Sequence, residues 1–512
     1  MIEVRGVMRG KTAVFLPQTM RLVWQTGLLL GLFLLFFGYV QYGAAGLAGN
    51  DGYYHMKMGY LMRQEGLTPT FDVLPYTILN EAAYYDHHLL YHAFLALFAT
   101  TDPAIDGGVA LTQGAKLASM ILPSLAFLVA WWLLRGQGVP GTAVYTLALF
   151  AISQAFLYRM SMPRAQSLAL LLLLLGLHWL LQGQYKRLIP LGFVFVWAYN
   201  AFPLLLVVCG AYLLTILLLE RRLVWQAVAY PAAGILLGLL INPYFPQDFI
   251  FIYHHLLPKI GESATRVGNE WSPYQTWTLV ENSGYALAAF VLGILGLAWR
   301  KDRADKATLL TLLLALLFGF MLFKSRRFIE YFPPFALLFA AFSLAPLLRE
   351  ARAWLQERGV APVLPLILAL GLLSYPLVTT LNEARAAVGD TKAADHFADA
   401  ALWLHHNTPP DSFVFQTDWD DFTRLFFYHS DAVYTAGLDP TFMELYDPDL
   451  FALWRDITQG RVEQPSTIIR QQFGGEYVFS DLNHGDFLAQ AAEDAGLVEL
   501  YRDEYAVIFA VK

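Results

Sequence analysis

The sequence predicts a polytopic α-helical membrane protein with a soluble α/β domain at its C-terminus. Of its 512 residues, 57% are hydrophobic, whereas soluble globular chains are roughly 45–50% apolar. Its mean hydropathy is +0.46, and the apolar residues are gathered in blocks long enough to cross a bilayer. After about residue 385 the sequence becomes acidic and alternates short β-like runs with amphipathic stretches, which is typical of a separate soluble domain.

The first apolar block runs from about Leu22 to Gln41 and follows several basic residues. A run of this length spans a bilayer, whereas a cleavable secretory signal has a shorter apolar core, so we expect a retained anchor. Ten further blocks follow, at 107–135, 139–158, 165–182, 188–200, 201–219, 225–242, 284–299, 307–323, 328–348 and 362–380. Because the block at 188–200 is short, the expected number of spans is about eleven to thirteen.

Basic residues set the expected orientation of these spans. With the N-terminus in the cytoplasm, most basic clusters fall on cytoplasmic ends, including Arg135, Lys186, Arg187, Arg221, Arg222, Arg300, Arg303, Arg349 and Arg352. The outer side then receives the loops 43–106 and 243–283. We therefore expect a transmembrane domain over 1–385 and an extracytoplasmic domain over 386–512, in a bacterial inner membrane or an archaeal plasma membrane.

Two basic clusters fall on the outer side, against this pattern. YRMSMPRAQ contains Arg159 and Arg164, and FKSRRFIEY contains Arg326 and Arg327. One explanation is that these side chains reach lipid phosphates at the membrane surface. Two such clusters on one face, beside acidic and His-rich loops, instead favour a site that binds a donor phosphate.

The loop 43–106 opens with GNDGYYHMKMG, which places Asp51 and His55 just beyond the first span. A carboxylate in this position is a candidate general base or cation ligand. The alternative is that Asp51 only caps the helix that follows it.

The same loop contains YYDHHLLYH, with one aspartate and three histidines in nine residues. Carboxylate and imidazole ligands suit Mn²⁺, Mg²⁺ or Zn²⁺, so Asp86 with His87 or His88 is a candidate cation site. If the run is helical, His88 and His92 lie four residues apart and share a face. The alternative is an interfacial helix whose polar groups contact lipid headgroups.

The loop 243–283 supplies two further candidates, Glu262 and Glu270. A loop of about 40 residues without a core of its own is usually functional. Either glutamate is a candidate to complete a cation site or to orient an acceptor, and a merely solvated loop is the alternative.

The C-terminal region contains SFVFQ, AVYTA, EYVFS and YAVIFAVK, which are typical of strands, and LYDPDLFALWRDITQG, which is typical of a helix with a Gly cap. The run Trp419–Asp420–Asp421 follows the first strand and begins a helix. The simplest role for Asp418 or Asp420 is an N-cap.

These motifs resemble those of the GT-C superfamily of membrane glycosyltransferases, and within it the catalytic subunits of oligosaccharyltransferases. DGYYH resembles the D-x-Y-Y-H of the first outer loop, which holds the family's catalytic Asp. DHH resembles the archaeal metal motif in letters, but lies one outer loop earlier than that motif. Glu262 or Glu270 resembles the glutamate of a long outer loop, and Arg326 or Arg327 resembles a basic residue at the outer end of a late span. ALWLHHNTPPDSFVFQTDWDDF resembles the start of the family's soluble domain, although WDDF stands in place of WWDYG.

The resemblance implies transfer of a sugar or glycan, with inversion, from a polyprenyl-phosphate-linked donor to an acceptor at the outer membrane face. The implied catalytic residues are Asp51, Asp86 and Glu270. The implied ligands of a divalent cation, Mn²⁺ or Mg²⁺ with Zn²⁺ as the alternative, are Asp51, Asp86, His88 and Glu270. The candidates for binding the donor phosphate are Arg159, Arg164, Arg326 and Arg327. The candidates for binding the acceptor are Trp419, Asp420, Asp421 and His55.

The nature of the acceptor stays open between a glycan, a lipid and a protein. The missing WWDYG favours a non-peptide acceptor, and an oligosaccharyltransferase that glycosylates protein is the alternative. A transporter or flippase of lipid-linked sugars is a second alternative, although its ionisable residues would lie at mid-membrane rather than at one face. A non-catalytic assembly protein is a third. A net charge of -7 without a basic tail argues against a nucleic-acid partner.

Overall fold

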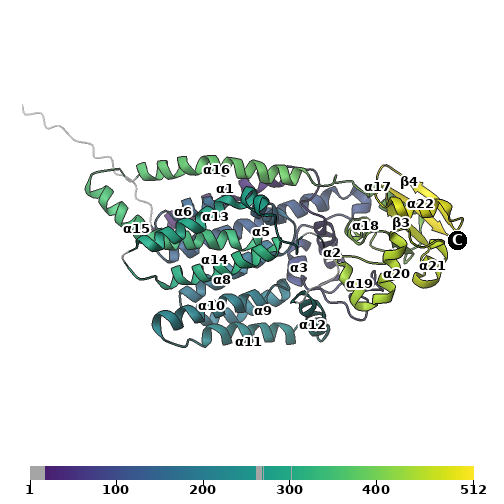
Figure 1. Cartoon of the computed structure of the whole chain (residues 1–512), viewed down its shortest axis with the longest axis horizontal. Helices are drawn as coiled ribbons and strands as arrows, with labels where there is room; N and C mark the ends of the chain where they lie inside the picture. Colours follow the sequence, from purple (N-terminus) through teal and green to yellow (C-terminus); the bar gives the residue numbers. More distant parts are fainter. Residues whose placement is uncertain (1–17, 261–267, 269, 301, 362) are drawn as a thin grey trace, which may run out of the picture.

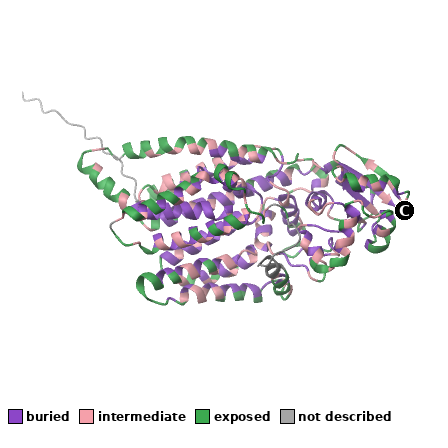
Figure 2. Ribbon diagram, in the orientation of Figure 1, coloured by how far each residue is buried: buried purple, intermediate pink, exposed green. Residues whose placement is uncertain are grey.

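The computed structural model describes residues 18–260, 268, 270–300, 302–361 and 363–512. A bundle of helices forms one end of an elongated molecule, and a region of mixed helices and strands forms the other (Figure 1). Buried residues run through the middle of the bundle, whereas α16 (Val363–Gly389) is largely exposed along one side (Figure 2). An exposed apolar helix of this kind is typical of a surface that faces lipid.

Within the described residues, seven helices are long and apolar enough to cross a membrane. They are α1 (Gln18–Gln41), α5 (Val109–Gly136), α10 (Pro203–Glu220), α13 (Thr276–Trp299), α14 (Lys306–Lys324), α15 (Phe332–Glu357) and α16. The number rises to eight if α7 (Gln154–Ser161) and α8 (Gln166–Leu181), which are bent by 107°, count as one broken span.

The expected eleven to thirteen spans are therefore not confirmed. Several apolar blocks form helices shorter than the about 20 residues that a span needs. The block 139–158 is divided between α6 (Thr142–Ala148) and α7, while α9 (Leu188–Ala198) has 11 residues and α11 (Gln226–Leu240) has 15.

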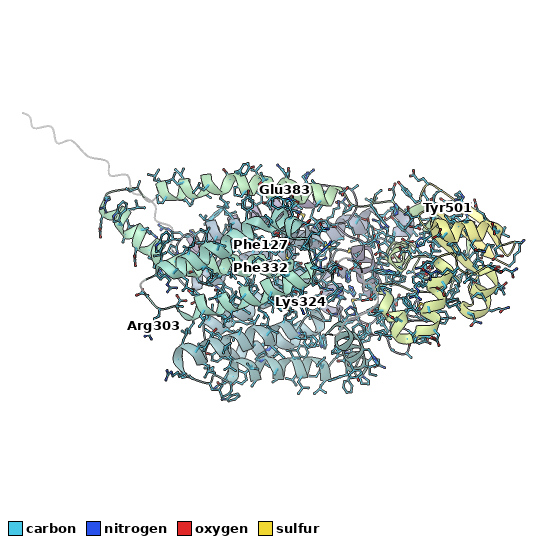
Figure 3. The ribbon with its side chains drawn as sticks, viewed as in Figure 1. Phe127, Arg303, Lys324, Phe332, Glu383 and Tyr501 are labelled. Carbon is cyan, nitrogen blue, oxygen red and sulfur yellow. The ribbon has the colours of Figure 1, made fainter. Side chains whose placement is uncertain are left out.

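Short helices cover the end of the bundle that faces the mixed region (Figure 1). They are α2 (Asp51–Glu65), α3 (Leu89–Ala96), α4 (Pro103–Asp106), α12 (Gln247–Ile260) and the 3₁₀ helix η2 (Arg326–Glu330). A further 3₁₀ turn, η1 (Tyr185–Arg187), precedes α9. Arg303 and Lys324 lie toward opposite ends of the bundle, which shows that α14 runs along its length (Figure 3).

The C-terminal region contains a five-stranded mixed sheet in the order β2-β1-β3-β5-β4. Its strands are β1 (Phe413–Gln416), β2 (Val433–Tyr434), β3 (Tyr477–Asp481), β4 (Leu497–Arg502) and β5 (Ala506–Val511). β1 pairs in parallel with β2 and β3, whereas β5 pairs antiparallel with β3 and β4. Four of these strands follow the predicted runs. β4 is the strand that the sequence analysis missed, because this edge strand is mostly exposed and lacks a clear apolar alternation.

The strands of this sheet are preceded and connected along the sequence by short helices. They are α17 (Ala398–Asn407), the 3₁₀ helix η3 (Trp419–Asp421), α18 (Phe422–Tyr428), α19 (Pro440–Tyr446), α20 (Pro448–Thr458), α21 (Pro465–Ile468), the π-helical turn η4 (Ile469–Phe473) and α22 (Gly485–Glu493). The helix expected in LYDPDLFALWRDITQG begins only at Pro448, because the Asp447 side chain caps it and accepts hydrogen bonds from the first backbone N–H groups.

The loop 43–106 and the C-terminal region share one apolar core. Tyr53 packs edge-on against Phe427 at 5.2 Å between ring centroids, and Tyr54 packs against Phe426 at 5.7 Å. The buried guanidinium of Arg424 lies over the Tyr53 ring and donates a 2.8 Å hydrogen bond to Oδ1 of Asn50. The start of α2 is thus held by residues more than 370 positions later in the chain.

Candidate functional site

A pocket lies at this junction between the bundle and the C-terminal region. It has about 570 Å³ of empty space, part of it open to solvent. Its walls come from α2, the turn before α3, the turn between α7 and α8, the turn between α9 and α10, η2 and the segment that begins α19. The lining residues are Asp51, Tyr54, His55, His87, His88, Arg164, Tyr199, Asn200, Arg327, Leu438, Asp439 and Phe442. Charged, imidazole and phenol groups from six segments therefore meet around one space.

Asp51 is the first residue of α2, and its side chain is 32% exposed. Its Oδ2 lies 3.3 Å from Nε of Arg164. The capping role that the sequence left open does not apply, because Asn50 occupies the N-cap position and the Asp51 side chain instead pairs with Arg164 at the pocket. A partly exposed carboxylate beside a cation is suited to hold and deprotonate a hydroxyl group.

Glu270 is bound by arginines from two different parts of the chain. Arg164 donates to it at 2.8 Å, Arg159 donates to it as well, and Arg327 lies 3.9 Å away. Burial by itself raises the pKa of Glu270, but Arg164, Arg159 and Arg327 outweigh it and hold that pKa well below its ordinary value. Glu270 is therefore an anion that neutralises this arginine cluster.

Glu330 is a second acidic partner of the arginine cluster. Arg159 donates through Nε to Oε1 of Glu330 at 2.9 Å, and both side chains are buried. Asp51, Glu270 and Glu330 thus carry three negative charges against the three positive charges of the arginines Arg159, Arg164 and Arg327.

Of the two adjacent arginines in η2, only Arg327 lines the pocket. Its guanidinium donates to the Tyr199 hydroxyl at 2.5 Å and lies over the Trp271 ring. Arg326 instead donates to the Pro273 carbonyl at 3.2 Å and lies over the ring of Tyr274. The two alternatives that the sequence left open for a phosphate ligand therefore occupy different surroundings.

Asp86 lies among histidines and does not line the pocket. Its Oδ2 is 2.7 Å from Nδ1 of His92, and its Oδ1 accepts a 2.9 Å hydrogen bond from the backbone N–H of His88. Nε2 of His92 is in turn 2.7 Å from Nδ1 of His55. Burial, followed by His92 and Arg164, lowers the pKa of His55 well below its ordinary value, so this imidazole is neutral.

The predicted cation ligands Asp51, Asp86, His88 and Glu270 do not come together as a single set. Among the described residues, the group whose ligand atoms all lie within 4.8 Å of one another consists of His55, His88 and His92. Asp51 and Glu270 are paired with arginines instead, which makes them poorer ligands for a cation. Glu262, the other candidate of that loop, lies outside the described residues.

The acceptor candidates in η3 occupy different depths. Trp419 packs against the smaller apolar core of the C-terminal region, and Asp421 is buried. Asp420 lies next to the start of α2. Nδ2 of Asn50, the residue before Asp51, donates a hydrogen bond to Oδ2 of Asp420 at 3.0 Å. Trp419, Asp420 and Asp421 all lie outside the pocket lining.

No protein-family model matches the chain, and no curated protein sequence matches it. Solved structures do match it over nearly its whole length. An oligosaccharyltransferase from Archaeoglobus fulgidus matches 96% of this chain and 74% of its own, with a TM-score of 0.66 at 14% identity. ArnT from Cupriavidus metallidurans, bound to undecaprenyl phosphate, matches 96% of this chain and 98% of its own, with a TM-score of 0.54 at 15% identity.

The arabinofuranosyltransferase AftD from Mycobacteria matches 95% of this chain and 40% of its own, with a TM-score of 0.56 at 14% identity. All three structures are GT-C membrane glycosyltransferases. The chain has the GT-C fold. The fold predicted from the resemblance is thereby confirmed, and in this GT-C fold the pocket lies where the helical bundle meets the C-terminal region.

Sequence reasoning missed two walls of the pocket. Tyr199 and Asn200 end a short apolar block and served only to divide two predicted helices. Leu438 to Phe442 carried no motif, although a proline at the start of α19 marks a helix beginning there. His92 was noted only as a partner of His88 on a helix face, and the buried Asp86 carboxylate that orients it could not be assigned from spacing.

An Asp420→Asn substitution is expected to stabilise the protein above pH 6. Burial, then the nearby Asp51 and Asp418 carboxylates, raise the pKa of Asp420 to about 6. The folded state disfavours the charged form of this carboxylate. The free energy of unfolding of the wild type therefore falls by up to roughly 3 kcal/mol as pH rises from about 4 to 6, and this contribution is constant above pH 6. Asn removes this loss and still offers an oxygen to Asn50.

Thermal unfolding between pH 4 and pH 8 measures the effect. The variant should match the wild type near pH 4 and unfold at a higher temperature at pH 7. Glu476→Gln, at an exposed position of the same region, is the matched control and should not change the pH dependence. A lower unfolding temperature for Asp420→Asn at pH 7 would mean that the carboxylate has a stabilising partner.

Proposed function

We propose that the protein transfers a sugar or glycan from a polyprenyl-phosphate-linked donor to an acceptor at the outer face of the membrane. The observation that carries this proposal is the pairing of Asp51 with Arg164 in a pocket that Arg327 also lines. A carboxylate that can activate a hydroxyl and guanidinium groups that can hold a phosphate are the two halves of such a reaction.

Asp51 is the group that binds the acceptor nucleophile. It takes the hydroxyl proton as the acceptor oxygen forms a bond to the anomeric carbon, while the bond from that carbon to the phosphate oxygen breaks. The released lipid phosphate carries the negative charge. In-line displacement of this kind inverts the anomeric centre.

Arg164 and Arg327 are the groups that hold the phosphate. Guanidinium groups bind phosphate through paired N–H donors, and a partly buried pocket strengthens each such contact. Arg159 is buried beneath them and acts as a positioning residue through Glu270 and Glu330. Since three carboxylates already balance the three arginines, a doubly charged phosphate needs further positive charge, and a divalent cation therefore belongs to the proposal.

Two neighbours support a lipid-phosphate donor. ArnT was solved with undecaprenyl phosphate, and the archaeal oligosaccharyltransferase AglB was solved with a dolichol-phosphate and an inhibitory peptide. We propose the same class of carrier here. We further propose that residues 386–512 form an extracytoplasmic domain, that 1–385 form the transmembrane catalytic domain, and that the host membrane is a bacterial inner membrane or an archaeal plasma membrane.

Protein is the second candidate acceptor. The specific observation in its favour is the higher TM-score to the oligosaccharyltransferase, 0.66 against 0.54 for ArnT. Against it stands the WDDF sequence, whose Trp419 packs against the smaller apolar core of the C-terminal region and does not line the pocket. A glycan or lipid acceptor is therefore the first candidate.

The test compares cells that lack this protein with cells in which the gene has been restored. Lipid-linked glycans, glycolipids and surface glycopeptides are profiled together by mass spectrometry. Loss of a glycolipid or surface polymer, with accumulation of one lipid-linked donor, is expected. Loss of glycopeptides alone would identify protein as the acceptor. A donor trapped on the cytoplasmic side, with transfer intact in opened membranes, would instead indicate a flippase.

A further inference from the structure

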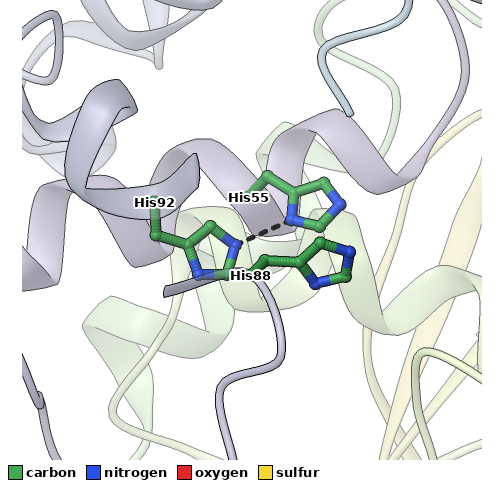
Figure 4. Close-up of side chains that lie close together, drawn as sticks. All are labelled: His55, His88 and His92. Atoms are coloured by element: carbon green, nitrogen blue, oxygen red, sulfur yellow. Dashed lines mark hydrogen bonds between the residues drawn. The ribbon is translucent and has the colours of Figure 1, made fainter. Parts of the chain in front are cut away.

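We propose that His55, His88 and His92 form a binding site for a transition-metal ion of the Zn²⁺ type at the edge of the pocket. The three imidazoles come from α2 and from the start of α3 and lie close together (Figure 4). Their ligand atoms all lie within 4.8 Å of one another. The sequence pattern had placed His88 and His92 on one helix face, but it did not join His55 to them.

The packing of two helices brings the ligands together. His88 and His92 lie one turn apart on one face, with the backbone N–H of His92 bonded to the His88 carbonyl at 2.8 Å. α2 crosses this face closely at Gly59, where a Cβ atom would come within 2.9 Å of Leu95. His55 lies one turn before Gly59, so the close approach carries its imidazole to the other two.

A carboxylate orients one of the imidazoles in the manner of a metal ligand. Asp86 is buried, and its Oδ2 lies 2.7 Å from Nδ1 of His92, which leaves Nε2 to face His55. Metal-binding histidines commonly donate their second N–H to a carboxylate, which fixes the ring and raises its basicity. The backbone N–H of His88 also donates a 2.9 Å hydrogen bond to Oδ1 of Asp86 and holds this carboxylate in place.

One ring nitrogen of the group lacks a partner. Nδ1 of His88 is buried and has no hydrogen-bond partner among the described residues. Leaving a buried polar atom without a partner costs about 1–3 kcal/mol, and a bound cation would remove that cost. The ring itself is held by stacking on Tyr199, at 5.2 Å between centroids.

Metal binding requires only a small movement. Nδ1 of His55 and Nε2 of His92 are 2.7 Å apart, which is a hydrogen-bond distance. Two nitrogens that share a tetrahedral Zn²⁺ at about 2.0–2.1 Å each are roughly 3.3 Å apart. The hydrogen bond therefore opens by about half an ångström as one ring turns.

The ligand chemistry selects the metal. Three neutral imidazoles suit Zn²⁺, Co²⁺ and related ions, whereas Mg²⁺ and Ca²⁺ prefer oxygen ligands. Three protein ligands with a free fourth position are typical of catalytic rather than structural zinc sites. Because His55 and His88 also line the pocket, the three histidines would hold the ion beside the space that Asp51, Arg164 and Arg327 share.

The metal ion would supply the positive charge that the arginine cluster lacks. This role in phosphate binding rests on the proposed function, whereas the metal site itself does not. One of the neighbouring structures, the Archaeoglobus fulgidus oligosaccharyltransferase, was solved with Zn and sulfate.

The test uses the purified full-length protein after chelator treatment, with Zn²⁺ alone by calorimetry and Co²⁺ alone by visible absorption. We expect one equivalent of Zn²⁺ and the absorption bands of tetrahedral Co²⁺, with no binding of Mg²⁺ at the same concentration. His88→Ala and His92→Ala should weaken binding by more than about 100-fold, and Asp86→Asn by about 10–100-fold. His406→Ala is the control: this exposed imidazole lies on α17, outside the pocket lining, and its removal should leave binding unchanged.

Absence of stoichiometric binding to the wild type would overturn the proposal, and so would binding that His88→Ala and His92→Ala both leave intact. His88 is only partly buried, so His88→Ala keeps the test valid if His92→Ala does not fold. Metal binding is measured without any sugar-transfer reaction, so its result does not depend on the proposed function. Metal binding without any transferase product would refute the proposed function alone, and transfer without metal binding would refute only the metal site.

Discussion

An Asp51→Asn variant is expected to form its transfer product about 10²–10⁴-fold more slowly than the wild type, the range that a general base typically contributes. Asn has the same shape and keeps the start of α2, but it cannot accept the proton of the acceptor hydroxyl. Arg164 keeps its 2.8 Å contact with Glu270, so the arginine cluster should stay in place. The loss should therefore appear in the rate of transfer and not in donor binding.

Initial rates measure this effect in membranes from cells that lack the chromosomal copy and carry each variant at equal protein level. The matched control is Asp72→Asn, an exposed carboxylate in the same loop, which should transfer at the wild-type rate. Asp51→Glu should recover part of the activity, because it restores the proton acceptor at a shifted position. Wild-type rates for Asp51→Asn would remove this residue from the catalytic step.

Arg327→Gln is expected to lower kcat/KM by about 10²–10³-fold, as removal of one donor from a transition-state anion site typically does. Its guanidinium lines the pocket beside Tyr199, and Gln retains a polar side chain without the charge. The binding of a polyprenyl phosphate without sugar should weaken as well, by about 10–100-fold, since a hydrogen bond to a charged group is worth roughly 1.5–3 kcal/mol.

The neighbouring arginine provides a stringent control. Arg326→Gln removes the same charge one residue away, but Arg326 contacts Pro273 and Tyr274 rather than the pocket. Its kcat/KM should stay within about twofold of the wild type, as is usual away from buried or functional contacts. Equal losses in both variants would mean that net charge at the membrane surface, and not the pocket, explains the effect.

The sequence predicted the parts of the site that are local. Asp51 and His55 lie on one short helix, and His88 and His92 lie one turn apart, so their chain spacing brings them near one another. The arginines Arg159, Arg164, Arg326 and Arg327 stood out because basic residues of membrane proteins usually lie on the cytoplasmic side, and these four were expected on the outer side. The same reasoning could not choose between Arg326 and Arg327, because adjacent residues of a 3₁₀ turn point in different directions.

The span count shows where apolar pattern reasoning stops. An apolar block reports that residues avoid water, but not whether they face lipid or the inside of the bundle. Residues 188–198 and 226–240 are as apolar as a span, yet they form the short helices α9 and α11, which pack together. Apolar composition is common to both situations, so hydropathy alone does not fix how many helices are long enough to cross the membrane.

By itself, the sequence determined the GT-C type of fold and four of the five strands, whereas the domain boundary near residue 385 and the roles of the site residues stay predictions. Only the tertiary structure decided which charges meet. Arg159 and Glu270 are 111 residues apart, Arg159 and Glu330 are 171 apart, and Asn50 and Asp420 are 370 apart. Periodicity and local propensity act over one or two turns, whereas these pairs form because helix packing and the docking of the C-terminal region bring distant segments together. For that reason Glu270, predicted as a cation ligand, has arginine partners, and the clustered ligand atoms belong to three histidines.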